Sequence, residues 1–147
     1  MQAAPNRITI EDSASIIQRK RVLLLEDSEY LKSLIKRFLE SNFYTVEAVT
    51  HGAEGIRSIL REEFDIIICD MKMPRLSGDR FYFAVKKTMP HLCRRFIFIT
   101  GYTGSTKIND FIKQVNGTML TKPFHLDELF EAVNIVQGNT SIGHFQS

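Results

Sequence analysis

The segment of residues 64–78 reads FDIIICDMKMPRLSG, and it carries the clearest fold signal in the chain. Its apolar run, Ile66 to Cys69, is short, β-branched and not alternating, which is typical of a strand buried on both faces of a parallel sheet. Pro74 and Gly78 then exclude a continuing strand or an immediate helix. We therefore expect Asp70 at the carboxyl end of a buried strand, the edge where open α/β sheets place their chemistry.

Apolar stretches of strand length alternate with helical patterns along the rest of the chain. The predicted strands are residues 21–25, 45–49, 66–70, 96–100 and 117–121. The predicted helices cover about residues 31–39, 52–60, 77–89, 107–115 and 126–133. Strict alternation with short connections predicts an α/β fold, a doubly wound five-stranded parallel sheet with helices on both faces. In the flavodoxin-like strand order 2-1-3-4-5, the first and third strands would be neighbours.

Three consecutive aromatic residues, Phe81, Tyr82 and Phe83, lie in the third predicted helix. Successive residues of an α-helix point about 100° apart, so these three rings cannot all face the sheet. We expect at least one of them to be partly exposed.

The composition indicates one globular domain with two short flanking segments. The chain has 147 residues, of which 44% are hydrophobic and 24% charged. We expect a flexible N-terminal extension over residues 1–20, including a short helix, then the folded domain over 21–136 and a C-terminal tail over 137–147.

Charge and cysteine content limit the location and the partners. The formal charge is +2 and the basic residues are scattered in sequence, which does not indicate direct contact with nucleic acid. No segment approaches the roughly 20 apolar residues of a membrane span, so no membrane contact is expected. Cys69 and Cys93 fit neither a metal site nor a disulfide framework, and we expect a reducing, cytoplasmic location.

Charged or hydroxyl-bearing side chains lie at the carboxyl ends of four of the five predicted strands. Glu26 and Asp27 follow the first strand, Asp70 ends the third, Thr100 ends the fourth and Lys122 follows the fifth. Because the carboxyl ends of parallel strands share one edge, we expect these side chains to converge. Three carboxylates held together repel one another and need protons or a cation. Mg²⁺ fits better than Zn²⁺, since no His or Cys cluster is offered.

This set of groups predicts phosphoryl transfer to Asp70, helped by Mg²⁺ and one lysine, Lys122. Phosphorylation would leave the site net negative. The Thr100 hydroxyl and nearby backbone N–H groups are the candidate donors for that extra charge.

The sequence resembles the receiver domain of two-component response regulators over about residues 21–136. The matching motifs are the pair Glu26-Asp27, the segment Asp70-Met71-Lys72-Met73-Pro74 with Gly78 beyond it, Thr100, and Lys122-Pro123-Phe124. The resemblance implies a phosphoprotein of a phosphorelay that is not an enzyme acting on other substrates. Asp70 would accept the phosphoryl group from a phosphohistidine of a sensor histidine kinase or a histidine phosphotransfer protein.

The same resemblance assigns the metal ligands. Asp27 and Asp70 would bind Mg²⁺ directly, Glu26 would hold it through water, and the backbone carbonyl of Lys72 would complete the protein ligands. For the phosphoryl group, it implies a pairing with Lys122.

The resemblance also assigns the response to phosphorylation. The Thr100 hydroxyl would bond the phosphoryl group in the active state, and the peptide bond before Pro123 is expected to be cis.

Three positions depart from the usual pattern of the family. Met119 stands three residues before Lys122, where an aromatic switch residue is usual. Tyr102 lies two residues past Thr100, and we hypothesise that it substitutes for that aromatic or gates access to the phosphoryl group. The Lys72 side chain could lean over the phosphoryl group and tune its hydrolysis, and Glu26 replaces the commoner aspartate.

These observations favour a response regulator that acts by protein–protein contact on an unknown downstream target. The expected surface is formed by the helix at 107–115, the strand at 117–121 and the last helix, and a homodimer is possible. Three alternatives remain: a receiver module of a hybrid histidine kinase acting as phosphate carrier, a phosphorylation-independent scaffold, and a metal-dependent hydrolase with Asp70 as nucleophile.

Overall fold

A computed structural model describes residues 19–101 and 105–138 of the chain. It contains five strands, five α-helices and one 3₁₀-helix. In chain order they are β1 (Arg21–Leu25), α2 (Glu29–Ser41), β2 (Thr45–Val49), α3 (Gly52–Arg61), β3 (Ile66–Asp70), α4 (Gly78–Thr88), η1 (Pro90–Arg95), β4 (Phe96–Thr100), α5 (Thr106–Gln114), β5 (Thr118–Thr121) and α6 (Leu126–Val136). The helix predicted within residues 1–20 falls almost wholly outside the described residues, as does most of the tail.

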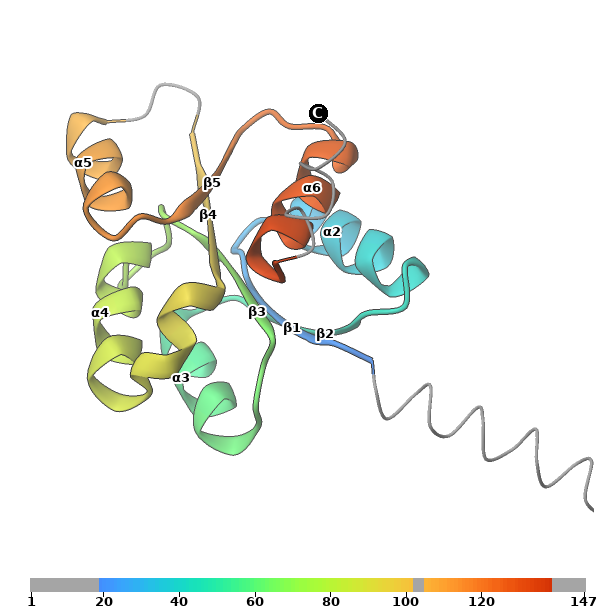
Figure 1. Cartoon of the computed structure of the whole chain (residues 1–147), viewed down its shortest axis with the longest axis horizontal. Helices are drawn as coiled ribbons and strands as arrows, with labels where there is room; N and C mark the ends of the chain where they lie inside the picture. The colour runs from blue at the N-terminus through green and yellow to red at the C-terminus, as the bar shows by residue number, and fades with distance from the viewer. Residues whose placement is uncertain (1–18, 102–104, 139–147) are drawn as a thin grey trace, which may run out of the picture.

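The five strands form one parallel sheet in the order β2-β1-β3-β4-β5 (Figure 1). The predicted strand order is confirmed, and β1 and β3 are neighbours, with Leu25 in register with Cys69. The sequence did not predict η1, which begins at Pro90 directly after α4 ends. Proline fits the first turn of a helix but not its interior, so the chain starts a new short helix there.

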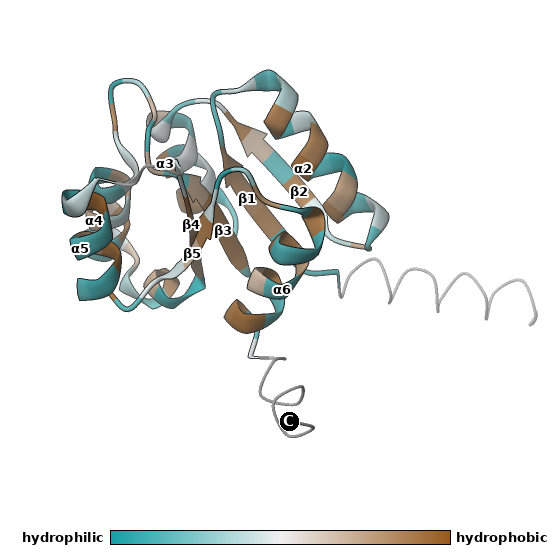
Figure 2. Cartoon of the chain, turned by 90° about the horizontal axis from the view of Figure 1, so that it is seen from above, coloured by the Kyte–Doolittle hydropathy of each residue, from teal (hydrophilic) through white to brown (hydrophobic). Residues whose placement is uncertain are grey.

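Helices cover both faces of the sheet, as predicted, and each face has its own apolar core (Figure 2). The core under α3, α4 and α5 contains the side chains of Leu23, Leu25 and Phe98. The core under α2 and α6 contains those of Val22 and Leu24. Neighbouring strand residues point to opposite faces, so a strand buried on both sides is apolar at every position.

The three consecutive aromatic residues of α4 divide as the helical period requires. Phe81 and Tyr82 are buried, whereas Phe83 is 42% exposed. The Phe83 ring contacts Phe111 of α5, with the ring centroids 5.5 Å apart. The expectation that one ring would be partly exposed is confirmed.

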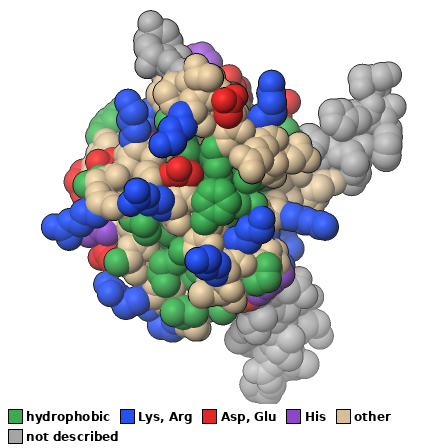
Figure 3. All heavy atoms as spheres, turned by 90° about the vertical axis from the view of Figure 1, so that its left-hand side faces the viewer, with side chains coloured by type: hydrophobic (Ala, Val, Ile, Leu, Met, Phe, Trp, Pro, Cys, Tyr) green, Lys and Arg blue, Asp and Glu red, His purple; other side chains and the backbone are tan. Residues whose placement is uncertain are grey.

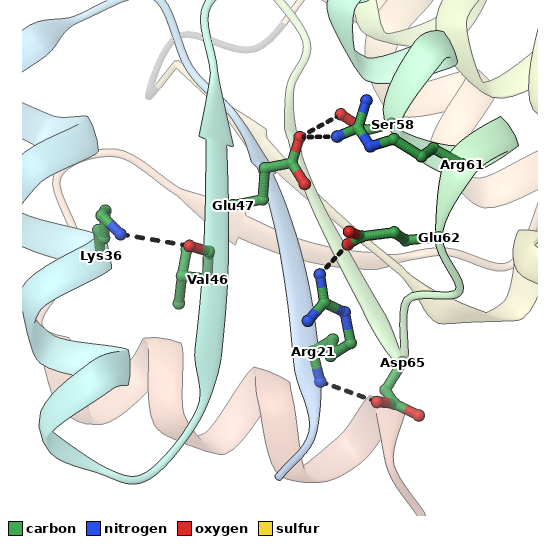
Figure 4. Close-up of polar contacts among 8 residues, drawn as sticks. All are labelled: Arg21, Lys36, Val46, Glu47, Ser58, Arg61, Glu62 and Asp65. Atoms are coloured by element: carbon green, nitrogen blue, oxygen red, sulfur yellow. Dashed lines mark hydrogen bonds and ion pairs between the residues drawn. The ribbon is translucent and has the colours of Figure 1, made fainter. Parts of the chain in front are cut away.

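Polar contacts stabilise the amino end of β1 and the edge strand β2 (Figure 4). The Arg21 guanidinium pairs with Glu62, and the Arg21 backbone N–H donates to Asp65 Oδ2 at 2.8 Å. On the edge strand, Lys36 Nζ donates to the Val46 carbonyl at 3.2 Å. A charged side chain over an edge carbonyl hinders pairing with another strand.

None of the helices formed by the described residues has both the length and the apolar character needed to cross a membrane.

Candidate functional site

Three carboxylates meet at the carboxyl edge of the sheet. Glu26 and Asp27 directly follow β1, and Asp70 is the last residue of the neighbouring β3. One carboxylate oxygen from each residue lies within 4.8 Å of the other two. Glu26 and Asp70 are buried and Asp27 is exposed, so this acidic cluster opens to solvent on the Asp27 side.

Asp70 is held by two nitrogen donors and a close backbone approach. The Lys72 backbone N–H donates to Asp70 Oδ1 at 3.0 Å, and Lys122 Nζ donates to Asp70 Oδ2 at 3.1 Å. Gly78, where α4 begins, passes close to the same strand end. A Cβ at position 78 would lie 2.9 Å from both the Asp70 carbonyl oxygen and Met71 Cα, so only glycine fits without a shift of the backbone.

Glu26 is fully buried, with a relative exposure of 0%. Its Oε2 accepts a hydrogen bond of 3.0 Å from the Ser28 backbone N–H. Its Oε1 has no hydrogen-bond partner and lies 3.9 Å from Lys122 Nζ. Burial is the main cause that raises the Glu26 pKa to about 7; the Asp70 charge adds to it, while the Ser28 N–H and Lys122 oppose it.

The unpartnered Glu26 oxygen and the three close carboxylates suit a hard divalent cation. All the side-chain donors are oxygens, and Mg²⁺ prefers carboxylate oxygens together with water. A bound cation would offset the repulsion that Glu26 and Asp70 exert on each other. The residues present therefore fit the magnesium site that the sequence predicts.

Lys122 reaches the acidic cluster from the end of β5. Its backbone N–H donates to the Thr100 carbonyl at 2.8 Å, which continues the pairing of β5 with β4. The Lys122–Pro123 peptide bond is cis. The Lys122 ammonium lies 3.1 Å from Asp70 Oδ2 and 3.9 Å from Glu26 Oε1.

Thr100 and Met119 lie on the same face of the sheet. Thr100 ends β4, is 2% exposed and comes one residue after Ile99, the register partner of Asp70. Met119 is the register partner of Phe98, and strand alternation places it on the face covered by α5. The Met119 side chain is 46% exposed, so it is a surface residue of β5.

Lys72 and Tyr102 are the other two residues predicted to tune phosphorylation, and the structure describes only the first. The Lys72 side chain is exposed beside the acidic cluster, and its backbone N–H bonds to Asp70. The assignment of its carbonyl as a metal ligand stays a prediction. Tyr102 falls outside the described residues, and its proposed gating role is untested.

A cleft next to the acidic cluster was missed in the sequence. It has a volume of about 620 Å³ and lies between the β3–α4 connection and α5. Asp27 is at one end, and the apolar lining includes Met71, Met73, Ile108 and Phe111. The sequence signal for this cleft was the alternation of Met71 and Met73 around Lys72. This alternation keeps two apolar side chains on one side of the chain past the end of β3.

The buried Glu26 predicts that the metal-free protein loses stability as the pH rises. A carboxyl group whose folded pKa is raised stabilises the fold below its unfolded pKa, and this contribution is lost as pH rises through the folded pKa. The window runs from about 4.5, the ordinary value, to about 7. We expect a decrease of about 1–3 kcal/mol in the free energy of unfolding across it, measured by urea denaturation in EDTA.

The control for this prediction is Glu26→Gln, which keeps the shape of the side chain and cannot ionise. The difference in unfolding free energy between Glu26→Gln and wild type should grow in favour of the variant from pH 5 to pH 8. Parallel pH profiles for the two proteins would show that Glu26 does not titrate in this range.

Known proteins resemble this chain in sequence. Transcriptional regulatory protein RprY of Bacteroides fragilis (strain YCH46) is 30% identical over 76% of this chain and 47% of its own length. The receiver protein CpdR of Brucella abortus (strain 2308) is 28% identical over 78% of this chain and 93% of its own length. Sensor kinase CckA of the same strain is 29% identical over 84% of this chain and 13% of its own. The chain thus spans less than half of RprY and a small part of CckA.

Solved structures share the fold. The chemotaxis protein CheY4 of Vibrio cholerae superposes with a TM-score of 0.73 at 26% identity, covering 80% of this chain and 98% of its own. The receiver domain of Francisella response regulator 1452 gives a TM-score of 0.71 at 26% identity, over 83% and 99%. The family model of the response regulator receiver domain matches residues 22–134. Together with the acidic cluster and Lys122 at the carboxyl edge of a 2-1-3-4-5 sheet, this match shows that the chain belongs to the response regulator receiver domains of two-component signalling.

Proposed function

We propose that this receiver accepts a phosphoryl group on Asp70, with Mg²⁺, from a sensor histidine kinase or a histidine phosphotransfer protein. One observation carries the proposal: the Asp70 carboxylate lies 3.1 Å from the Lys122 ammonium and within 4.8 Å of the carboxylates of Glu26 and Asp27. Receiver domains are signalling domains that interact with such kinases and phosphotransfer proteins.

In the proposed reaction, a carboxylate oxygen of Asp70 attacks the phosphorus of the partner's phosphohistidine. A P–O bond forms, the P–N bond breaks, and its electron pair returns to the imidazole. Asp27 and Asp70 would bind the Mg²⁺ directly, Glu26 through water, and the Lys72 carbonyl would add the last protein ligand. Bound Mg²⁺ supplies charge neutralisation at the transferring phosphoryl oxygens.

The charges of the site support this assignment. Three carboxylates balance one Mg²⁺ and the Lys122 ammonium, so the resting site is close to neutral. Phosphorylation adds negative charge. We propose that the Thr100 hydroxyl, at the buried end of β4, turns to donate a hydrogen bond to the phosphoryl group.

Met119 makes the response of this receiver different from the usual one. In other receivers an aromatic side chain at this position is coupled to the threonine, and an exposed methionine on β5 cannot supply that ring. We propose that Tyr102 substitutes for the aromatic residue or gates access to the phosphoryl group. We further propose that the exposed Lys72 side chain tunes water attack on the acyl phosphate.

The receiver unit is proposed to span residues 21–136, with output by protein contact on a downstream target and a homodimer possible. A cytoplasmic location is also proposed. It is supported by Cys69 and Cys93, which both lie in the described residues and are unpaired.

Intact-mass spectrometry with acetyl phosphate as the phosphodonor tests the proposed function. With Mg²⁺ present, we expect an added mass of about 80 Da, that of one phosphoryl group. Removing Mg²⁺ with EDTA should abolish the adduct, because the carboxylates then repel the anionic donor. An adduct of equal yield in EDTA would exclude the proposed metal site. A protein that gains no mass in Mg²⁺ and fails to bind beryllofluoride would support the phosphorylation-independent scaffold.

A second candidate is a phosphate-carrier receiver from a hybrid histidine kinase. The match to part of the sensor kinase CckA favours it, because 84% of this chain aligns with only 13% of that protein. In that case the phosphoryl group should leave Asp70 for the histidine of a phosphotransfer protein. Incubating radiolabelled phosphorylated receiver with such a protein and following the label on a gel would detect this transfer.

A further inference from the structure

The positive charge of this protein is concentrated in one part of the fold. Residues 71–117 contain nine Lys and Arg against two Asp and no Glu, a net charge of +7. Since the whole chain carries +2, the other residues carry −5. This basic segment forms the β3–α4 connection, α4, η1, β4 and α5. Residues that are scattered in sequence therefore gather on one side of the sheet.

The exposed cations of this segment have no charged partner among the described residues. They are Lys72, Arg75, Arg80, Lys86, Lys87, Arg94, Lys107 and Lys113. None of them forms one of the ion pairs within 4.0 Å. Among the described residues outside this segment, Arg21, Lys32, Lys36 and Arg61 each pair with a glutamate, whereas Arg37 has no such pair. Unpaired cations leave a positive potential that attracts an acidic partner.

Apolar side chains occupy the middle of the same face. Figure 3 shows hydrophobic side chains gathered at the centre of this side of the molecule, with many Lys and Arg and a few Asp and Glu around them. The two helices touch here through aromatic rings: Phe111 of α5 lies 5.5 Å, centroid to centroid, from both Tyr82 and Phe83 of α4. The Phe83 ring is 42% exposed beside this contact, so part of it is available to a bound partner.

Hollows lie at both ends of this aromatic contact. The cleft of about 620 Å³ near the acidic cluster is lined by Met71, Met73, Ile108 and Phe111. Toward the other end of the helices, a second hollow of about 610 Å³ is lined by Tyr82 and Arg94 among others. The α4–α5 groove is defined as these two hollows with Phe83 and Phe111 between them. Its floor is mainly apolar in the first hollow and more polar in the second. Lys72 and Lys107 line the first hollow together with the carboxylates of Asp27 and Asp79, and Arg94 lines the second. Methionine side chains adapt readily to the shape of a bound partner.

We propose that the α4–α5 groove binds an acidic amphipathic helix of a partner protein, with the helix's apolar face on Phe83 and the methionines and its carboxylates toward the lysines of the rim. Helix-in-groove recognition requires such an apolar floor, and charge complementarity sets the partner's sign. The proposed surface shares α5 with the one expected from the sequence but extends to α4 instead of β5 and α6. It does not depend on phosphorylation of Asp70.

The charge pattern alone would also suit nucleic acid, and the apolar floor alone would suit a second copy of the chain. Nucleic acid gains little from an apolar floor beneath the basic rim, because its backbone contacts are ionic. A second copy would bring the same unpaired cations against these ones, and like charges facing each other are unfavourable. The combination of both features therefore favours the acidic helix.

The test uses two synthetic peptides of about 14 residues, four helical turns, with the same leucine face. One carries Glu at the polar positions and the other carries Lys. Each is fluorescently labelled and titrated with the full chain in EDTA, without phosphodonor, and binding is followed by anisotropy. We expect the Glu peptide to bind at least tenfold more tightly than the Lys peptide. Amide shifts in a ¹⁵N-labelled sample should fall on α4, α5 and the β3–α4 connection.

Variants on the groove are compared with matched variants outside it. Phe83→Ala should weaken binding of the Glu peptide about tenfold, and Lys87→Glu and Lys107→Glu about fivefold each. The controls Leu60→Ala on α3 and Arg37→Glu on α2 remove an exposed apolar residue and an unpaired cation elsewhere, and should change binding less than twofold.

Three outcomes would overturn the proposal: equal affinity for the two peptides, amide shifts on α2 and α6, or unchanged binding in the groove variants. Tighter binding to a DNA duplex than to the Glu peptide, or concentration-dependent dimerisation through Phe83, would assign the groove to those occupants instead. Because the protein is neither phosphorylated nor metal-bound here, failure of the docking proposal is separate from failure of Asp70 to accept a phosphoryl group.

Discussion

Asp70→Asn is expected to abolish the Mg²⁺-dependent phosphoryl adduct entirely. The amide has nearly the shape of the carboxylate but lacks the negative charge and the nucleophilic oxygen, so neither bond formation to phosphorus nor strong metal binding is retained. In wild type the Lys122 ammonium lies 3.1 Å from Asp70 and 3.9 Å from Glu26. In the variant the side chain at position 70 is neutral, so Glu26 is the only one of these two partners that stays anionic. Intact-mass spectrometry after acetyl phosphate treatment measures the loss.

The matched control is Asp110→Asn, which makes the same chemical change on the exposed surface of α5. It should be phosphorylated to the wild-type level. Circular dichroism should show that the Asp70→Asn variant is folded, so that loss of the adduct reports the chemistry. An adduct that persists in Asp70→Asn would mean that another residue accepts the phosphoryl group.

Phe98→Ala is expected to lower the free energy of unfolding by about 3–5 kcal/mol, a large part of the stability of a domain of this size. Phe98 is 1% exposed, and its ring centroid lies 5.3 Å from that of Phe96 and 5.3 Å from that of Phe111. Gly117 leaves room for the ring, because a Cβ at that position would lie 2.7 Å from it. Urea denaturation at constant pH measures the change.

Phe83→Ala serves as the comparison, since it removes the same side chain from a position that is 42% exposed. We expect it to cost only about 1 kcal/mol, because much less surface is buried and no closed cavity is formed. Equal losses of unfolding free energy for the two variants would show that the cost of removing the ring does not depend on its burial. A small loss at Phe83 also keeps this variant folded for the binding experiment on the α4–α5 groove.

The position of the acidic residues could be predicted because it depends on short, local patterns, whereas the strand order was predicted from the topology of doubly wound folds. A buried parallel strand must be apolar on both faces, so the run ending at Asp70 was recognisable without any structure. Parallel strands joined by crossover helices have their carboxyl ends at one edge of the sheet, and the order 2-1-3-4-5 makes the first and third strands neighbours. That is sufficient to bring Glu26, Asp27 and Asp70 together.

Other features depend on distances across the fold that no local pattern records. Glu26 and Asp27 are adjacent acids in the sequence, yet one is fully buried with a raised pKa and the other is exposed. The difference arises because Glu26 turns under the end of β1 toward Lys122, which is 96 positions later in the chain. The exposure of Met119 likewise depends on how neighbouring segments pack.

The sequence by itself determined the α/β class and the set of chemical groups at the carboxyl edge, because periodicity and strand-end residues are encoded locally. Only the tertiary structure decided which carboxylate loses its water and which cations stand unpaired, because desolvation and ion pairing are set by neighbours distant in sequence. The α4–α5 groove is the clearest case. The basic residues looked scattered along the chain, and the fold brings Lys72 and Lys107 to one apolar cleft and Arg94 to the hollow at its other end.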